Sequence, residues 1–153
     1  MDYNKHYGKI INEMINKSFH ELKGKKIIIK EFTSKKYTGS ALKMPFFHVI
    51  AINKKLRNDK KVLIGILSHE LSHLVIFDSE GWIKYLLDGI PYWINPKKRK
   101  QIDVDADKLA IKKGYGKELY YVREKSLKNS KLKHVRKYYL NPKEIKKYMK
   151  KSK

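Results

Sequence analysis

Apolar residues recur at every third or fourth position near the start of the chain, and this spacing predicts an amphipathic helix over residues 3–22. A β-branched run at residues 26–32 predicts a short strand. A second strand is predicted over residues 44–53, and the polar residues 33–40 between the two strands are predicted to form a turn. The chain is therefore expected to open with one helix and a small sheet.

The most apolar stretch of the sequence follows the second strand. Asn58 or Asp59 is suited to cap the amino end of a helix that runs to about Phe77. Within this helix, three small residues stand at i, i+3 and i+7 and form a strip that lets another element approach closely. The members of this strip are Gly65, Ser68 and Ser72.

Three further helices are predicted from the residues that mark helix ends. Asn95 can cap the first of them, Pro96 fits its first turn, and Gly114 stands where a left-handed residue ends a helix. Residues 117–129 repeat the helical spacing. Asn141, followed by Pro and by Glu three positions later, begins a short C-terminal helix, whose lysine-rich end is expected to fray.

Length and composition place the chain among globular proteins with one core. It has 153 residues, of which 41% are apolar, and we interpret residues 1–153 as a single domain. No uninterrupted apolar run reaches the ~18 residues of a membrane span, and the first residues lack the apolar core of a signal peptide. A cytoplasmic protein is therefore expected. The order of the elements predicts an α+β fold with a small mixed sheet.

The chain carries a formal charge of +22, from 37 Lys and Arg against 15 Asp and Glu. A surplus of this size favours binding to nucleic acid or to an anionic membrane. Against this interpretation, only four of the cations are Arg, which forms the forks typical of specific phosphate recognition, and Lys is spread along the whole chain. The same composition suits a heat-adapted protein. A basic nucleic-acid-associated protein, with a structural or vestigial zinc site, is therefore kept as the alternative hypothesis.

One motif in the apolar helix indicates a specific chemistry. In His69-Glu70-Leu71-Ser72-His73 the two histidines are four residues apart, so both rings leave the same face of a helix. Two imidazoles in this arrangement can hold one Zn²⁺, and Glu70 beside them can act as a base toward a water molecule at the metal. The chain has no cysteine, so a further ligand must be a histidine or an oxygen donor.

A third ligand is expected from the helix that begins near Asn95. This helix contains three aspartates within five positions, and because Asp is a poor helix former, a metal site would explain their presence. Asp103, 30 residues after His73, is the candidate ligand. A cationic or donor group across the cleft would stabilise the developing oxyanion, and His134 or Arg136 is suggested for this role.

These residues resemble those of a known family. Residues 58–73, with the strand before them, look like the gluzincin metallopeptidases. Residues 103–110 are similar to the E-x-x-A-D-x-x-A signature of the CAAX prenyl protease and HtpX heat-shock protease group. The chain is far shorter than those membrane enzymes, and it resembles the minigluzincins, which are minimal versions of their catalytic domain. The resemblance covers roughly residues 26–113 and implies a zincin-like fold.

Carried over residue by residue, the resemblance implies that His69 and His73 bind zinc and that Glu70 is the general base. Asp103 stands at the position of the third ligand. Asp107 stands at the position of an aspartate that supports the site by orienting a ligand histidine.

The family has Glu where this chain has Asp103, and Asp is one methylene shorter. The helix backbone must therefore come closer to the metal, or Asp105 or Asp107 is the third ligand instead.

The resemblance implies a zinc metallopeptidase that acts on peptide or protein substrates. It also implies that a terminal segment, residues 141–153, can keep the enzyme latent by lying in the cleft. The order of sheet and helix places the strand at 46–52 along the rim of that cleft, where an extended peptide can pair with it. The alternative is that this strand simply belongs to the core, and both interpretations can hold together.

Overall fold

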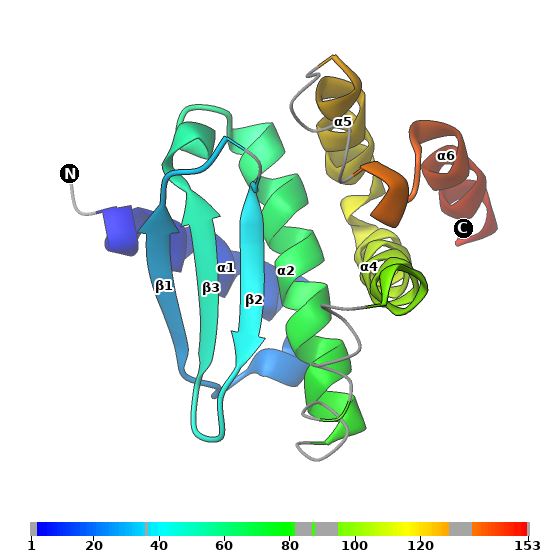
Figure 1. The fold of residues 1–153 in the computed structure, drawn as a ribbon. Helices are drawn as coiled ribbons and strands as arrows, with labels where there is room; N and C mark the ends of the chain where they lie inside the picture. Colours follow the sequence, from blue (N-terminus) through cyan, green and yellow to red (C-terminus); the bar gives the residue numbers. More distant parts are fainter. Residues whose placement is uncertain (1–2, 36, 82–86, 88–94, 129–135, 153) are drawn as a thin grey trace.

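The chain adopts an α+β fold in which a three-stranded mixed sheet is followed by a group of helices (Figure 1). The computed structural model describes residues 3–35, 37–81, 87, 95–128 and 136–152. Its elements are α1 (Tyr3–Lys17), η1 (His20–Leu22), β1 (Ile27–Phe32), β2 (Gly39–Lys43), β3 (His48–Asn53), η2 (Lys54–Leu56), α2 (Lys60–Glu80), α4 (Pro96–Ala110), the π-helical turn η3 (Ile111–Tyr115), α5 (Gly116–Leu127), η5 (Arg136–Tyr138) and α6 (Pro142–Lys151).

β3 is the central strand of the sheet. It runs parallel to β1, with Ile29 opposite Ile50, and antiparallel to β2, with Ala41 opposite Ile50. The prediction that the strand at 46–52 forms the edge along the cleft is therefore wrong, and the alternative of a core strand is confirmed. The strand also begins at His48, later than its predicted start, because the residues before it turn the chain back from β2.

β1 and β2 are the two edge strands, and β2 begins inside the predicted turn at residues 33–40. Its pairing depends on Asn53, whose backbone N–H donates to the carbonyl of Thr38 at 3.0 Å. The Asn53 side chain donates to the carbonyls of Ser34 and Tyr37, each at 2.7 Å, and so fixes the loop that leads into β2. These bonds join segments that are distant in sequence, which local composition cannot indicate.

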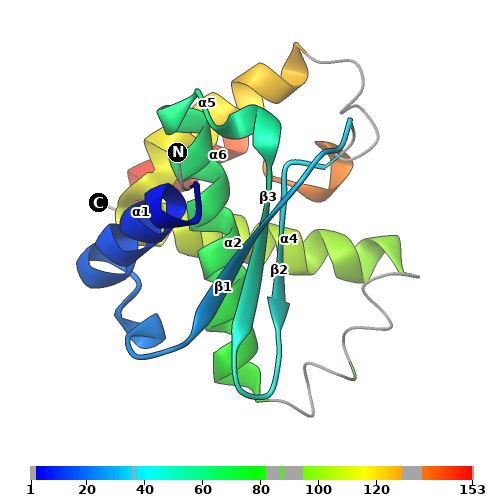
Figure 2. The ribbon, with the colours of Figure 1, turned by 90° about the vertical axis from the view of Figure 1, so that its left-hand side faces the viewer.

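The covered face of the sheet packs against α1 and α2, which lie on the same side of it in Figure 2. In β3, His48, Ile50 and Ile52 point inward, while the residues between them are only half-buried. The helix predicted over residues 3–22 is confirmed as far as Lys17, where α1 ends, and a separate 3-10 helix, η1, follows at His20–Leu22. The core residues of this layer are Tyr7, Ile10, Ile11, Met14, Ile15, Phe19, Leu22, Ile50, Ile52, Leu63, Leu67, Leu71 and Leu74.

α2 lies between the sheet and the C-terminal helices (Figure 1). Asp59, one of the two predicted caps, accepts the backbone N–H of Val62 at 3.0 Å, and the helix ends at Glu80. Neighbours on both sides explain why the middle of α2 is buried all round rather than along one stripe. In the described part of the chain, α2 is the helix long and apolar enough to cross a membrane. Because 67% of its apolar window is buried inside the protein, this is a weak indication of a span.

Gly65 lets α5 approach α2 closely. A β-carbon at this position would stand 2.7 Å from the carbonyl oxygen of Glu118 and 2.6 Å from a methyl group of Val122. Ser68 and Ser72, the other members of the small-residue strip, are fully buried, and each hydroxyl donates to a carbonyl of its own helix. The close approach that the strip predicts is confirmed.

The helices after α2 follow their predicted end signals. The side chain of Asn95 accepts the backbone N–H groups of Lys97 and Lys98, at 2.9 and 3.2 Å, and Pro occupies the first turn of α4. Gly114, with φ of 96°, lies in the π-helical turn that separates α4 from α5. Glycine adopts this left-handed conformation without the steric cost that other residues meet.

The C-terminal helix begins as predicted, and the fraying of its lysine-rich end stays a prediction. Asn141 and Glu144 form the capping box at the start of α6. The helix extends to Lys151, and the fully buried Ile145 packs against α4, η3 and α5. The buried residues of this second cluster are Ala110, Ile111, Leu119, Leu140 and Ile145.

We expect Gly65→Ala to lower the free energy of unfolding by about 1–2 kcal/mol. Overpacking lowers the free energy of unfolding by about 1–3 kcal/mol. The upper part of that range applies because the added β-carbon would meet backbone atoms of α5, which cannot move aside easily. Alanine is a better helix former than glycine, and this difference raises the free energy of unfolding by at most about 1 kcal/mol. Gly8→Ala in α1 is the matched control, since a β-carbon there has no neighbour within 4 Å, and its stability should be unchanged or higher. Urea unfolding followed by circular dichroism measures both variants, and an unchanged midpoint for Gly65→Ala would contradict the close contact.

Candidate metal centre

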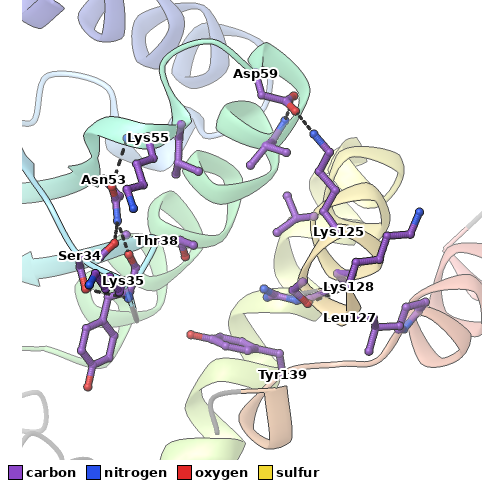
Figure 3. A pocket seen from close by; sticks show the side chains of 18 of the residues that line it. Ser34, Lys35, Thr38, Asn53, Lys55, Asp59, Lys125, Leu127, Lys128 and Tyr139 are labelled. Atoms are coloured by element: carbon purple, nitrogen blue, oxygen red, sulfur yellow. Dashed lines mark hydrogen bonds and ion pairs between the residues drawn. The ribbon is translucent and has the colours of Figure 1, made fainter. Parts of the chain in front are cut away.

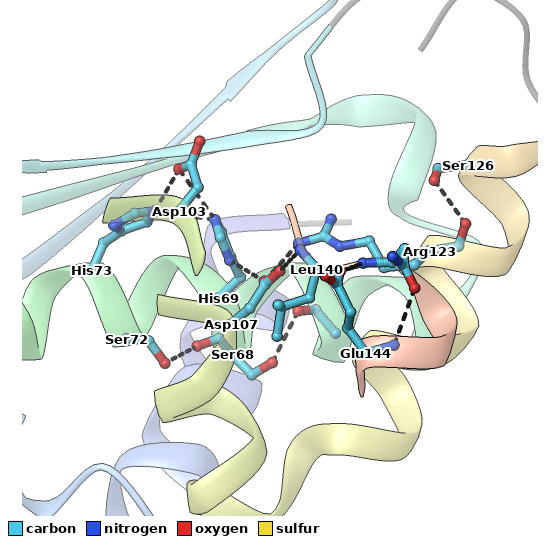
Figure 4. A network of polar contacts seen from close by, with 12 residues as sticks. Ser68, His69, Ser72, His73, Asp103, Asp107, Arg123, Ser126, Leu140 and Glu144 are labelled. Carbon is cyan, nitrogen blue, oxygen red and sulfur yellow. Dashed lines mark hydrogen bonds and ion pairs between the residues drawn. The ribbon is translucent and has the colours of Figure 1, made fainter. Parts of the chain in front are cut away.

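Three side chains from two helices meet at one point. His69 and His73 leave the same face of α2, and Asp103 reaches them from α4 (Figure 4). The two Nε2 atoms are 3.0 Å apart, and Asp103 Oδ1 lies 3.3 Å from Nε2 of His73 and 3.9 Å from Nε2 of His69. All three residues are buried. Together they form a group that can hold a metal ion.

The spacing of these donor atoms suits a tetrahedral ion with short bonds. For bonds of about 2.1 Å to nitrogen and oxygen, neighbouring ligand atoms of a tetrahedron are about 3.4 Å apart. Of the observed separations, 3.0 and 3.3 Å are shorter than that value and 3.9 Å is longer. Two imidazole nitrogens and one carboxylate oxygen are also donors typical of catalytic zinc sites, which keep a fourth position open.

The structure distinguishes the three aspartates of α4. Asp103 is 1% exposed and lies beside the histidines. Asp105 has 43% of its side chain exposed and accepts a hydrogen bond from Gln101 at 2.7 Å. Asp107 stands one turn beyond Asp103, and other groups engage both of its carboxylate oxygens. Among the three alternatives, Asp103 is therefore the one whose oxygen can share an ion with both histidines.

The carboxylate of Asp107 joins His69 to the C-terminal part of the chain. Its Oδ1 accepts from Nδ1 of His69 at 2.8 Å and from a terminal nitrogen of Arg123 at 2.7 Å. Its Oδ2 accepts the backbone N–H of Leu140 at 2.9 Å. Because an ionised carboxylate can only accept, Nδ1 of His69 carries the proton and Nε2 is left for a metal.

The charges around Asp107 determine the protonation of this pair. Burial by itself would raise the pKa of the Asp107 carboxyl, but Arg123 and His69 hold that pKa below its ordinary value. Burial by itself would likewise lower the pKa of His69, but the charge and hydrogen bond of Asp107 raise it. Asp107 is thus an ionised, fixed partner, as the residue that orients a ligand histidine must be.

Glu70 lies between the metal-binding group and the edge of the sheet. A β-carbon on Gly39 would stand 2.7 Å from Oε1 of Glu70 and 2.9 Å from a methyl group of Ile66, so glycine is what lets β2 pass over this carboxylate. Glu70 is buried, and burial raises its pKa against the opposing influence of His69 and His73. A carboxylate with a raised pKa is suited to accept a proton and pass it on.

His73 and Asp103 are oriented by different contacts. The ring of His73 stacks on Phe77 with 5.5 Å between centroids, and its Nδ1 has no hydrogen-bond partner among the described residues. Nε of Arg99 lies 3.7 Å from Oδ2 of Asp103, and the guanidinium of Arg99 covers the ring of Tyr138 at 4.3 Å. Packing therefore orients His73, whereas a cation one helical turn away holds Asp103.

Two residues that the sequence pattern does not single out lie beside His69. The ring of Tyr139 meets the ring of His69 edge-on, with 5.4 Å between centroids, and the guanidinium of Arg123 lies 4.0 Å from the centre of the Tyr139 ring. No local signal marks either residue, because both reach the site through tertiary contacts.

His134, suggested to stabilise the oxyanion, lies outside the described residues, and so does the side chain of Arg136.

Residues 142–151, within the segment predicted to lie in the cleft, form α6 and pack through Ile145 against other helices. The C-terminal residues next to the metal-binding group are Tyr139 and Leu140, which precede this helix. Latency through residues 141–153 stays a prediction.

A scan of the sequence against protein-family models finds no match, and searches of curated proteins and of solved structures find no significant match either. Function is therefore inferred from the arrangement of the side chains. The four that matter most are His69, Glu70, His73 and Asp103.

Asp103→Ala should weaken Zn²⁺ binding by at least about 100-fold if Asp103 is a ligand. The loss of a residue that only supports a ligand costs about 10–100-fold. Asp105→Ala is the matched control, since it removes a carboxylate from the solvent side of the same helix. Its zinc affinity should equal that of the wild type. Competition with a chromophoric chelator measures both affinities. Equal affinities for the two variants would show that Asp103 is not a ligand.

Asp107→Asn should lower the free energy of unfolding by about 3–5 kcal/mol, because it leaves the buried Arg123 without its counter-charge. The double variant Asp107→Asn/Arg123→Met removes that charge as well and should recover part of the loss. Urea unfolding of the two single variants and the double variant gives the coupling energy. Strictly additive losses would show that the two residues do not depend on each other.

Proposed function

We propose that this protein is a zinc-dependent peptidase with a zincin-like fold, similar to the minimal gluzincins that its motifs resemble. The observation that carries the proposal is the convergence of His69, His73 and Asp103 from two helices, with the buried Glu70 beside them. Two histidines four apart on a helix, with a third ligand from a separate element, are the usual zinc ligands of such hydrolases. Imidazole donors favour zinc over magnesium or calcium, which prefer oxygen ligands.

Zinc in this site would polarise the substrate carbonyl and lower the pKa of water to about 7. The residues of the chain carry out the proton transfers. Glu70 takes one proton from water as the water oxygen bonds to the carbonyl carbon. Glu70 then gives that proton to the amide nitrogen, the C–N bond breaks, and a carboxylic acid and an amine are released. Throughout, Asp107 holds His69 in the tautomer that presents Nε2.

The edge of β2 that faces away from β3 pairs with no strand in the described part of the chain and offers a place for the substrate backbone. The Asn53–Thr38 hydrogen bond sets the pairing, so alternate residues of β2 direct their main-chain groups toward β3, and Gly39 and Ala41 direct theirs outward. Because Gly39 lies over Glu70, a peptide that pairs with this outward edge passes the carboxylate. β2 thus takes the role that the sequence pattern assigned to the strand at 46–52.

We propose Tyr139 as a second candidate for stabilisation of the oxyanion. Its ring lies beside His69, and Figure 3 shows its hydroxyl directed toward the loop between β1 and β2. A phenol hydroxyl can donate to an oxygen on which negative charge develops. We therefore extend the proposed site to Tyr139, alongside the prediction for His134.

Glu70→Gln should keep the zinc affinity of the wild type and lower the rate of peptide cleavage by about 10²–10⁴-fold, because an amide cannot accept the proton. Glu13→Gln, on the exposed side of α1, is the matched control and should change neither property. Metal analysis and cleavage of a mixed peptide pool by zinc-loaded protein measure the two effects.

Cleavage by Glu70→Gln at the wild-type rate would exclude the proposed role of this residue. If the wild type does not cleave peptides but binds DNA or RNA with a steep salt dependence, the nucleic-acid alternative is favoured.

A further inference from the structure

A cavity of about 600 Å³ lies between the loop before β2 and α5. Its lining includes Gly39, which passes over Glu70, and also Arg123 and Tyr139, the two residues beside His69. Glu70, His69, His73 and Asp103 do not line it. The cavity is related to them through Gly39, Arg123 and Tyr139.

Both walls of the cavity are fixed by polar contacts (Figure 3). On the sheet side, Asn53 donates to two carbonyls of the loop that carries Lys35. On the helix side, Lys125 of α5 pairs with Asp59, which ties α5 to the amino end of α2. The cavity is thus built before any ligand binds, and the ordering of its walls costs little on binding.

The charge on these walls is almost entirely positive. The cations of the lining are Lys35, Lys55, Arg123, Lys125 and Lys128. Asp59 is the only carboxylate among the lining residues, and it is already paired with Lys125, as Arg123 is with Asp107. The other three lysines are exposed and have no carboxylate within ion-pair distance in the described part of the chain.

We propose that this cavity binds acidic side chains of the peptide substrate, so that the protein selects segments rich in Asp and Glu next to the cleaved bond. The inference rests on the proposed peptidase function and names its substrate class. Each exposed ion pair is expected to raise affinity about 1.4- to 5-fold. The charge of +22 attracts the same class of peptide over longer distances.

An acidic peptide suits the cavity better than a single strand of nucleic acid, although both carry negative charge. The outward edge of β2 offers main-chain hydrogen bonds that a peptide can match and a nucleic acid cannot. The ring of Tyr139 is already covered by Arg123 and is not free to stack on a base. Leu56, Val62 and Val122 add an apolar part to the lining, which suits the aliphatic stems of side chains.

The test is a binding experiment with the full-length Glu70→Gln variant loaded with zinc, so that the peptide stays intact. The probes are short labelled peptides that differ only in whether their charged positions are Glu, Gln or Lys, and fluorescence anisotropy gives the affinities. We expect the Glu peptide to bind about tenfold more tightly than the Gln peptide at low salt. The difference should shrink in 1 M salt, where screening acts within about 3 Å.

Two triple variants separate the cavity from the overall charge. Lys35→Ser/Lys55→Ser/Lys128→Ser should abolish most of the preference for the Glu peptide. The matched control, Lys9→Ser/Lys17→Ser/Lys23→Ser, removes the same charge from exposed positions outside the lining and should keep the preference. Equal loss in both variants would overturn the proposal, because net charge alone would then explain the binding. Both variants are checked for an unchanged circular dichroism spectrum.

Further outcomes separate this proposal from the peptidase function. If the Glu peptide binds as expected but the wild type cleaves no peptide, the proposed function fails and the acidic-ligand cavity stands. If the wild type cleaves Glu, Gln and Lys peptides at equal rates and binds them equally, the cavity proposal fails and the function stands. If a thymidine oligonucleotide binds more tightly than the Glu peptide, with the same dependence on the three cavity lysines, the cavity is a nucleic-acid site and the proposal is overturned.

Discussion

The buried carboxylate of Asp107 is the contact on which the candidate site depends. It accepts hydrogen bonds from His69 on α2, from Arg123 on α5 and from the backbone of Leu140 before α6. A buried ion is stabilised only where its oxygens are satisfied and a counter-charge is near. Three separate segments must therefore meet around one side chain. The orientation of a proposed ligand and the assembly of the C-terminal helices are consequently coupled.

Two glycines allow the surrounding elements to come close enough to α2. Gly65 admits the backbone of α5, and this approach brings Arg123 within reach of Asp107. Gly39 admits the edge strand β2 over the carboxylate of Glu70. A side chain at Gly65 would push the backbone of α5 away from α2, and a side chain at Gly39 would do the same to β2. The two glycines therefore shape the site in addition to the proposed ligands.

The distribution of charge is also consistent with the proposed chemistry. The chain has far more cations than carboxylates, yet Glu70, Asp103 and Asp107 are buried together in the described structure. Carboxyl groups are concentrated at the point where two histidines converge, and their oxygens are suited to hold a cation there. Positive charge dominates the adjoining cavity, which favours an anionic partner. One protein can in this way attract an acidic chain and still hold a metal cation inside.

Features that depend on neighbours along the chain could be predicted from the residues alone. They are the helical spacing of His69 and His73, the caps at Asn95 and Asn141, and the α+β order of the elements. Local hydrogen bonds and helical periodicity produce these features, so they can be predicted without knowledge of the fold. Three features became visible only in the fold: β2 is the edge strand over Glu70, Asp103 is the aspartate that reaches the histidines, and Arg123 and Tyr139 lie beside His69. The packing of α2 against α4, α5 and the sheet sets these distances. Residues far apart in the sequence determine that packing together, so a local pattern cannot reveal it.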